Sequence, residues 1–109
     1  MDSLFSLFKK EYNNTEVLEV ENGFATFIFK GDMVYLEDIF VRAEHRNTGL
    51  ATILADSVAE IAKQQGCTVM LGSVNLKSSN PTRSMKVLLA YGMSPTHATG
   101  DMVFFKKDI

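Results

Sequence analysis

Apolar residues recur along this chain with two different periods, and the change of period separates strands from helices. In residues 34–41 apolar, β-branched and aromatic side chains dominate, and only Glu37 and Asp38 interrupt them, which predicts a strand. After residue 42 the apolar positions are three and four residues apart, which predicts an amphipathic helix that ends at Gly66. Its apolar stripe contains Leu50, Ile53, Leu54, Val58, Ile61 and Ala62.

The segment before this strand predicts a helix and a β-hairpin. Residues 2–13 have an amphipathic pattern that begins at Asp2 or Ser3, and we expect its apolar side to cover one face of a sheet. Residues 15–30 alternate around Asn22-Gly23, which is a strong signal for a tight hairpin turn. We therefore expect a meander of three antiparallel strands that ends with residues 34–41.

The segment after the central helix predicts the rest of a mixed sheet. A strand that follows the helix should lie parallel to residues 34–41, because right-handed crossovers through a helix join parallel strands. The predicted elements are a strand at 67–75, a helix at 82–91, an extended piece at 93–97 and a last strand at 101–107. Cys67 begins the first of these strands, and we expect it to be a small core residue.

The composition favours one globular domain and argues against several function classes. The 109 residues are 46% hydrophobic and 22% charged, and the net charge of -2 argues against a nucleic-acid partner. A single cysteine and two distant histidines indicate neither an internal disulfide nor a metal site. No segment has the ~20 apolar residues that span a bilayer, so we expect a cytoplasmic protein without a membrane partner.

The turn between the central strand and helix carries the strongest candidate chemistry. Its residues are Arg46, Asn47, Thr48, Gly49, Leu50 and Ala51. The first N–H groups of a helix have no partner inside it and carry the positive end of the helix dipole, so a diphosphate can bind there. Gly49 and Ala51 keep side-chain bulk away from such an anion, and Asn47 or Thr48 is expected to cap the empty helix. A short turn without a ligand remains the alternative.

This turn resembles the central motif of the GNAT acyltransferases, R/Q-x-x-G-x-G/A, which starts here at Arg46. Asn47 stands where the family often has glycine. Residues 35–41 (YLEDIFV) are most similar to the diamine (spermidine/spermine) acetyltransferases of that family. The resemblance implies a compact α/β (α+β) fold in a single acetyltransferase-like domain, residues 1–109. In that fold a mixed, mainly antiparallel sheet has a parallel pair at the cofactor cleft and helices on both faces.

The N-terminal region is shorter than in typical members of the family. Residues 1–14 stand where such a member has two helices and a strand. Those helices form one wall of the acceptor site in the family. The acceptor site should therefore be more open here, or a second subunit of a homodimer should complete it.

The resemblance also implies acetyl-CoA as the cosubstrate, with no metal. Backbone groups of the central strand would hold the pantetheine arm and polarise the thioester carbonyl where two parallel strands separate. These groups belong to Ile39, Phe40 and Val41. The turn at 46–51 would bind the diphosphate, and Asn80 and Arg83, before and within the next helix, are candidates for contacts with the cofactor arm.

Glu37 is the candidate catalytic base and amine anchor. The matching glutamate of the diamine acetyltransferases contacts the cationic acceptor and helps to remove its proton; the alternative is a solvated carboxylate on an uncovered sheet face. Adjacent strand residues point to opposite faces, so Asp38 is expected to face away from Glu37 and is a second candidate for contacting the acceptor. The tyrosine that commonly protonates the leaving thiolate in the family is Leu88 here, and Tyr91 is expected in the core.

These features predict the transfer of an acetyl group from acetyl-CoA to a primary amine of a small molecule, peptide or protein, by direct attack on the thioester. The acidic pair favours a cationic acceptor, and a diamine, a lysine side chain, an N-terminal amine and an aminoglycoside remain open. The alternative is a non-catalytic CoA-binding regulatory module that acts on a partner protein. A degenerate fold with an empty cleft is a third hypothesis.

Overall fold

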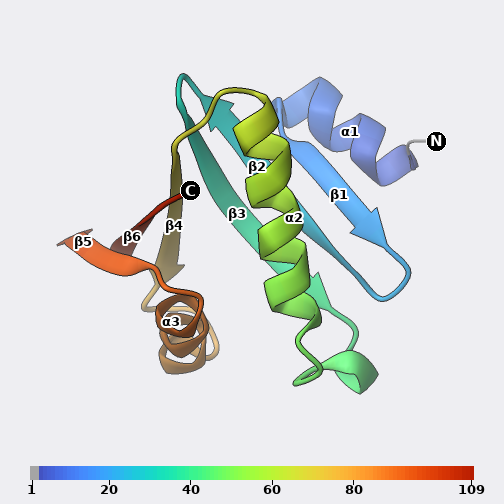
Figure 1. The fold of residues 1–109 in the computed structure, drawn as a ribbon. Helices are drawn as coiled ribbons and strands as arrows, with labels where there is room; N and C mark the ends of the chain where they lie inside the picture. The colour runs from blue at the N-terminus through green and yellow to red at the C-terminus, as the bar shows by residue number, and fades with distance from the viewer. Residues whose placement is uncertain (1–2) are drawn as a thin grey trace.

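One mixed sheet organises the protein in a computed structural model that describes residues 3–109 (Figure 1). Within that range six strands follow the order β1-β2-β3-β4-β6-β5. The strands are β1 (Glu16–Val20), β2 (Gly23–Lys30), β3 (Met33–Val41), β4 (Val69–Asn75), β5 (Ser94–Thr99) and β6 (Met102–Asp108). The helices are α1 (Leu4–Asn13), α2 (Leu50–Gln64) and α3 (Pro81–Ala90), and a short 3-10 turn, η1 (Ala43–His45), precedes α2. The expected α/β (α+β) fold with a mixed sheet is confirmed.

Helices cover both faces of the sheet, as predicted. α2 packs on β2 and β3 through its buried residues Leu54, Ala55, Val58, Ala59 and Ala62. α3 lies on the same face, because Leu88 of α3 adjoins Gly72 of β4. α1 lies on the opposite face, where the ring centroid of Phe5 is 5.2 Å from that of Phe24, the neighbour of the core residue Ala25.

α1 covers its face of the sheet less completely than its pattern predicts. Ser3 caps the helix by accepting the N–H of Ser6 at 3.0 Å, whereas Asp2 lies outside the described residues. No residue of α1 is buried, and Leu4 and Tyr12 are 86% and 73% exposed. The prediction of a packed apolar side therefore holds only around Phe5. α1, like the other helices within residues 3–109, lacks the long apolar run needed to cross a membrane.

β3 and β4 pair over only part of their length. The parallel pairing that the crossover predicts begins at Met33 and Val69 and ends at Tyr35 and Leu71. β3 continues to residue 41 and β4 to residue 75, and Figure 1 shows the two strands moving apart over these stretches. After Tyr35 the edge of β3 that faces β4 has no strand partner.

A β-bulge in β3 places two acidic residues on the same face of the sheet. Thr26 of β2 pairs with Asp38, but the register then shifts by one residue and leaves Glu37 as an extra residue. Asp38 accepts a hydrogen bond from Thr26 at 3.4 Å, on the face where Phe24 meets α1. Glu37 lies 3.9 Å from the ammonium of Lys9 in α1. The expectation that Glu37 and Asp38 face opposite ways is wrong, because the bulge breaks the two-residue period.

Cys67 is a core residue, as expected. It is 4% exposed at the end of the α2–β4 connection. Burial and, to a smaller extent, the charge of Asp32 raise the pKa of its thiol. A thiol with a raised pKa stays protonated near neutral pH and is a poor nucleophile.

Candidate active site

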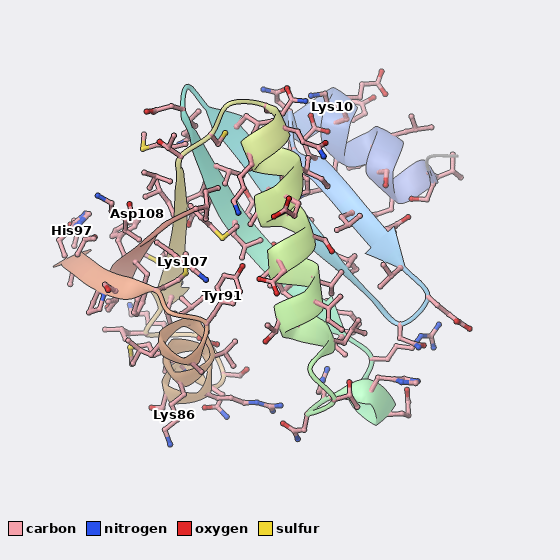
Figure 2. All side chains as sticks on the ribbon, viewed as in Figure 1. Lys10, Lys86, Tyr91, His97, Lys107 and Asp108 are labelled. Atoms are coloured by element: carbon pink, nitrogen blue, oxygen red, sulfur yellow. The ribbon has the colours of Figure 1, made fainter. Side chains whose placement is uncertain are left out.

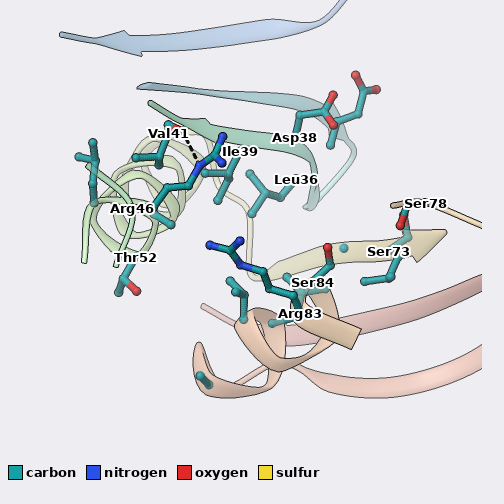
Figure 3. Close-up of a pocket in the computed structure, with 18 of the residues that line it drawn as sticks. Leu36, Asp38, Ile39, Val41, Arg46, Thr52, Ser73, Ser78, Arg83 and Ser84 are labelled. Atoms are coloured by element: carbon teal, nitrogen blue, oxygen red, sulfur yellow. Dashed lines mark hydrogen bonds between the residues drawn. The ribbon is translucent and has the colours of Figure 1, made fainter. Parts of the chain in front are cut away.

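A cleft of about 700 Å³ opens where β3 and β4 separate. β3 and the turn after it form one side, and β4 and α3 form the other, with the first turn of α2 at one end (Figure 3). Ten of the predicted site residues line this cleft. They are Glu37, Asp38, Ile39, Val41, Arg46, Asn47, Gly49, Leu50, Ala51 and Arg83.

The turn before α2 leaves the start of the helix open. Asn47 has φ 63° and Gly49 has φ 87°, so both occupy the left-handed region. Asparagine adopts this conformation more readily than most residues other than glycine. Asn47 can therefore stand where the family often has glycine. Gly49 is the N-cap, and no side chain caps α2. The prediction that Asn47 or Thr48 caps the helix is wrong, because the Thr48 hydroxyl donates to the carbonyl of His45 instead.

Two arginines supply positive charge near this open helix end. The Nε of Arg46 donates to the carbonyl of Val41 at 3.0 Å, and its guanidinium lies 5.8 Å from the ring centroid of Phe40. That bond occupies one of five N–H donors, so the others can contact an anion. Arg83 extends from α3 on the other side of the cleft (Figure 3). Together with the first N–H groups of α2, the arginines make this end attractive to a phosphate.

The other end of the cleft is acidic. Glu37 and Asp38 line it from β3, and Figure 3 shows Asp38 on the side away from Arg46. Ser73 of β4 also lines the cleft, and its hydroxyl hydrogen-bonds to that of Tyr35 near the last paired residues of β3 and β4. The cleft therefore separates a cationic region from an anionic one along its length.

Residues 7–83 match the acetyltransferase (GNAT) family. The chain belongs to this family. It is 35% identical over 77 residues to aminoglycoside N(6')-acetyltransferase type 1 of Acinetobacter baumannii, a match that covers 71% of this chain and 49% of that protein. It is 40% identical over 45 residues to thialysine N-epsilon-acetyltransferase of Bos taurus, covering 41% of this chain and 26% of that protein. The chain thus spans less than half of the length of each of these two relatives.

The fold agrees with solved structures of the GNAT family. The PaiA N-acetyltransferase of Thermoplasma acidophilum, crystallised in complex with coenzyme A, has a TM-score of 0.78 and 13% identity to this chain. The similarity covers 97% of this chain and 69% of that one. At this level of identity the comparison shows that the two proteins share a fold.

The position of the usual GNAT tyrosine is apolar in this cleft. Leu88 lines the cleft, whereas Tyr91 does not and packs against the core cluster, as expected. The hydroxyl of Tyr91 donates to Asp56 at 2.8 Å, and the ammonium of Lys107 lies 3.7 Å from its ring centroid (Figure 2). Burial and the bond to Asp56 raise the pKa of Tyr91. Tyr91 therefore links α3 to α2 and lies outside the cleft.

Three predicted site residues place their side chains outside the cleft. The side chain of Phe40 stacks on Phe24 on the α1 face, with 5.5 Å between ring centroids, although its predicted role concerns only its backbone. Thr48 bonds to the backbone of its own turn. Asn80 caps α3 by accepting the N–H of Arg83 at 3.1 Å, so its side chain serves the helix.

Several residues that line the cleft were not singled out from the sequence. All of them have a polar or small side chain, and they lie either on β4 or near the start of α2 or α3. They are Thr52, Gly72, Ser73, Asn75 and Ser84. His45 is partly buried and also lines the cleft. The alternation of β4 is the signal that could have found Ser73 and Asn75. Among the described residues no group of three His, Cys, Asp or Glu could hold a metal ion.

Proposed function

We propose that this GNAT protein transfers the acetyl group of acetyl-CoA to a primary amine by direct attack of the amine on the thioester. The observation that carries the proposal is the separation of charge in one cleft. An uncapped helix start with two arginines faces one end, and two carboxylates on one face of a bulged strand line the other. The first suits a diphosphate and the second suits an ammonium.

The residues of the cleft fit acetyl-CoA as the cosubstrate. The diphosphate would bind the first N–H groups of α2, with Arg46 and Arg83 on either side. The pantetheine arm would follow the edge of β3 that lacks a strand partner, where Ile39 and Val41 line the cleft. N–H groups on such an edge are available to a ligand carbonyl and would stabilise the oxyanion that forms when the amine attacks.

The acceptor would bind at the acidic end. Glu37 would hold the ammonium and help to remove its proton, and Asp38 would add a second negative charge on the same face. With Leu88 in place of the usual tyrosine, water would protonate the leaving thiolate. The two relatives are named for an aminoglycoside and for thialysine, both of which carry cationic amines, and this supports a cationic acceptor.

A homodimer, expected from the sequence, would cover apolar side chains of α1. Leu4, Leu7, Phe8 and Tyr12 are between 49% and 86% exposed. Burial of such side chains against a second copy would stabilise the pair. Light scattering of the purified chain decides the matter, and a monomer across a wide range of concentrations would remove this part of the proposal.

Thr52 offers a test of the cofactor end that does not strain the backbone. It is an exposed residue in the first turn of α2, and it lines the cleft. Thr52→Glu should raise the free energy of unfolding by about 0.3–1 kcal/mol, because a negative charge is favourable at a helix start. The same charge should weaken acetyl-CoA binding by repelling the diphosphate. Thr52→Gln, without the charge, is the matched control.

The assay is thermal unfolding with and without acetyl-CoA. At about 100 times its dissociation constant the ligand should stabilise the wild type by ~2.7 kcal/mol, a rise of several degrees. Thr52→Glu should melt higher without ligand and gain less from it, whereas Thr52→Gln should gain as the wild type does. No gain in the wild type, or an equal gain in Thr52→Glu, would contradict the assignment.

Thiol release with a panel of amines then tests the transfer itself. A protein that releases coenzyme A only when an amine is present is an acetyltransferase. Binding of acetyl-CoA without thiol release across diamines, lysine peptides and aminoglycosides would instead favour the regulatory module.

A further inference from the structure

Two neighbouring lysines of α1 each face a glutamate of the sheet, but only one of those glutamates lines the cleft. The ammonium of Lys10 is 2.6 Å from a carboxylate oxygen of Glu16, at the start of β1. The ammonium of Lys9 is 3.9 Å from a carboxylate oxygen of Glu37, which lines the cleft. The side chain of Lys9 is 23% exposed and that of Lys10 is 55% exposed, so the lysine nearer to the cleft is the less accessible to solvent.

The backbone fixes Lys9 at the place where α1 joins the sheet. The carbonyl of Lys9 accepts the N–H of Thr15 at 3.1 Å, and Thr15 is 1% exposed. Asn14 between them takes a left-handed conformation with φ 52°, which turns the chain from α1 into β1. The backbone of Lys9 is thus held at the start of β1, from where its side chain reaches Glu37 of β3, even though α1 buries none of its residues.

The ammonium of Lys9 is positioned but not locked. A separation of 3.9 Å is longer than a direct hydrogen bond between N and O, so the pair is a loose electrostatic contact. The four-carbon stem of lysine lets the amine turn while its backbone stays in place. Lys9 does not line the cleft in this arrangement, and it approaches Glu37 from the α1 side.

From these contacts, and resting on the proposed function, we propose that Lys9 is itself an acetyl acceptor, so that the protein acetylates its own first helix. The ammonium of Lys9 loses a proton to Glu37 or, through it, to water. The amine nitrogen then attacks the carbonyl carbon of acetyl-CoA, and the C–N bond forms. As the C–S bond breaks, the nitrogen gives up its second proton to solvent and an amide is left on Lys9. The thiolate leaves and takes a proton from solvent. An amine tethered beside the base reacts at a high effective concentration.

The test is incubation of the purified full chain with acetyl-CoA, followed by intact mass and by fragment mass spectra that separate Lys9 from Lys10. Lys77, which is 77% exposed, reports spontaneous acetylation of an accessible lysine. We expect Lys9 to be modified at least about tenfold faster than Lys77, because proximity outweighs exposure. The rate at Lys9 should not depend on protein concentration. Equal rates at Lys9 and Lys77, or a rate at Lys9 that rises with protein concentration, would overturn the inference.

Matched variants separate this inference from the proposed function. Glu37→Gln should slow acetylation of Lys9, whereas Glu16→Gln, next to the neighbouring lysine, should leave it unchanged; equal slowing in both would overturn the role of Glu37 in the step. Thiol release with external amines but no acetyl group on Lys9 would refute the inference and leave the proposed function standing. No thiol release with any amine, and no acetyl group on Lys9, would refute both.

Discussion

Replacement of Glu37 by glutamine tests the acidic end of the cleft with little change of shape. The folded state loses one ion pair, with the ammonium of Lys9 at 3.9 Å. Coulomb's law gives about 1 kcal/mol for such a pair in bulk water, and exposed pairs contribute ~0–1 kcal/mol when measured. The side chains are 23% and 32% exposed, so solvent screens the pair. The free energy of unfolding should therefore fall by less than about 1 kcal/mol.

The effect on turnover should be much larger than the effect on stability. A positioned general base contributes about 10²–10⁴-fold, and we expect kcat/KM to fall by at least about 10²-fold in Glu37→Gln. Such a fall corresponds to about 2.7 kcal/mol of transition-state stabilisation. The stabilisation by acetyl-CoA should stay close to that of the wild type, because the diphosphate end lies at the far side of the cleft. The assays are thiol release, urea unfolding and the thermal shift with acetyl-CoA.

Glu16 provides the matched control. It is 33% exposed and pairs with the adjacent lysine of the same helix, but it does not line the cleft. Glu16→Gln should cost at least as much stability as Glu37→Gln, because its pair with Lys10 is a direct hydrogen bond at 2.6 Å, and it should leave kcat/KM unchanged. If both variants keep the turnover of the wild type, Glu37 has no part in the chemistry. If kcat/KM falls in both variants in proportion to the loss in the free energy of unfolding, the two carboxylates support turnover only by stabilising the folded protein.

Two further substitutions test the leaving-group side and the link between α2 and α3. Leu88→Tyr should raise kcat by up to about tenfold, because it places a phenol in the cleft that can protonate the thiolate. Leu88→Phe has the ring but no hydroxyl and should not raise kcat. Equal kcat values in these two variants would refute the prediction. For Tyr91 the raised pKa fixes the sign of a pH effect. Below about pH 10 the phenol is neutral in both states, but above it the unfolded chain ionises while folded Tyr91 keeps its proton, so stability falls as pH rises. Urea unfolding at about pH 9 and pH 11 should show a shallower fall in Tyr91→Phe, and an identical fall would contradict it.

The sequence predicts the elements around the cleft well because the side of each element that packs on the core is marked by apolar residues within that element. Residues 50–64 show the helix period because one side of the helix packs on the core, and residues 34–41 are mostly apolar because the strand packs there too. The parallel neighbour of β3 follows from the handedness of crossovers, a rule that applies to any strand, helix and strand in succession. The open turn is also local, since Gly49 and Asn47 are residues that adopt its left-handed backbone.

The features that the sequence did not predict depend on pairing between distant segments. Whether Glu37 and Asp38 share a face is decided by the register of β2, which lies more than ten residues earlier. Alternation along β4 places Ser73 and Asn75 on one face, but Ser73 lines the cleft because β4 leaves β3 after Leu71, and the sequence of β4 does not mark that point. Thr48 could have capped α2, but η1 brings the carbonyl of His45 within its reach.

The bulge at Glu37 decides on which face of the sheet the two carboxylates lie, and the pairing of β2 with β3 fixes the position of the bulge. Beyond the bulge β2 stays paired with β3 as far as Gly23 and Val41. A Cβ atom on Gly23 would lie 2.4 Å from the carbonyl oxygen of Phe40, so the two backbones approach more closely than any other residue type would allow. The register therefore cannot slip without breaking this contact. A strand without the extra residue would turn Glu37 or Asp38 to the α2 face, away from the side on which α1 presents Lys9. The close contact between Gly23 and Phe40, which fixes the register of β2 and β3, thus helps to keep both carboxylates on the α1 face.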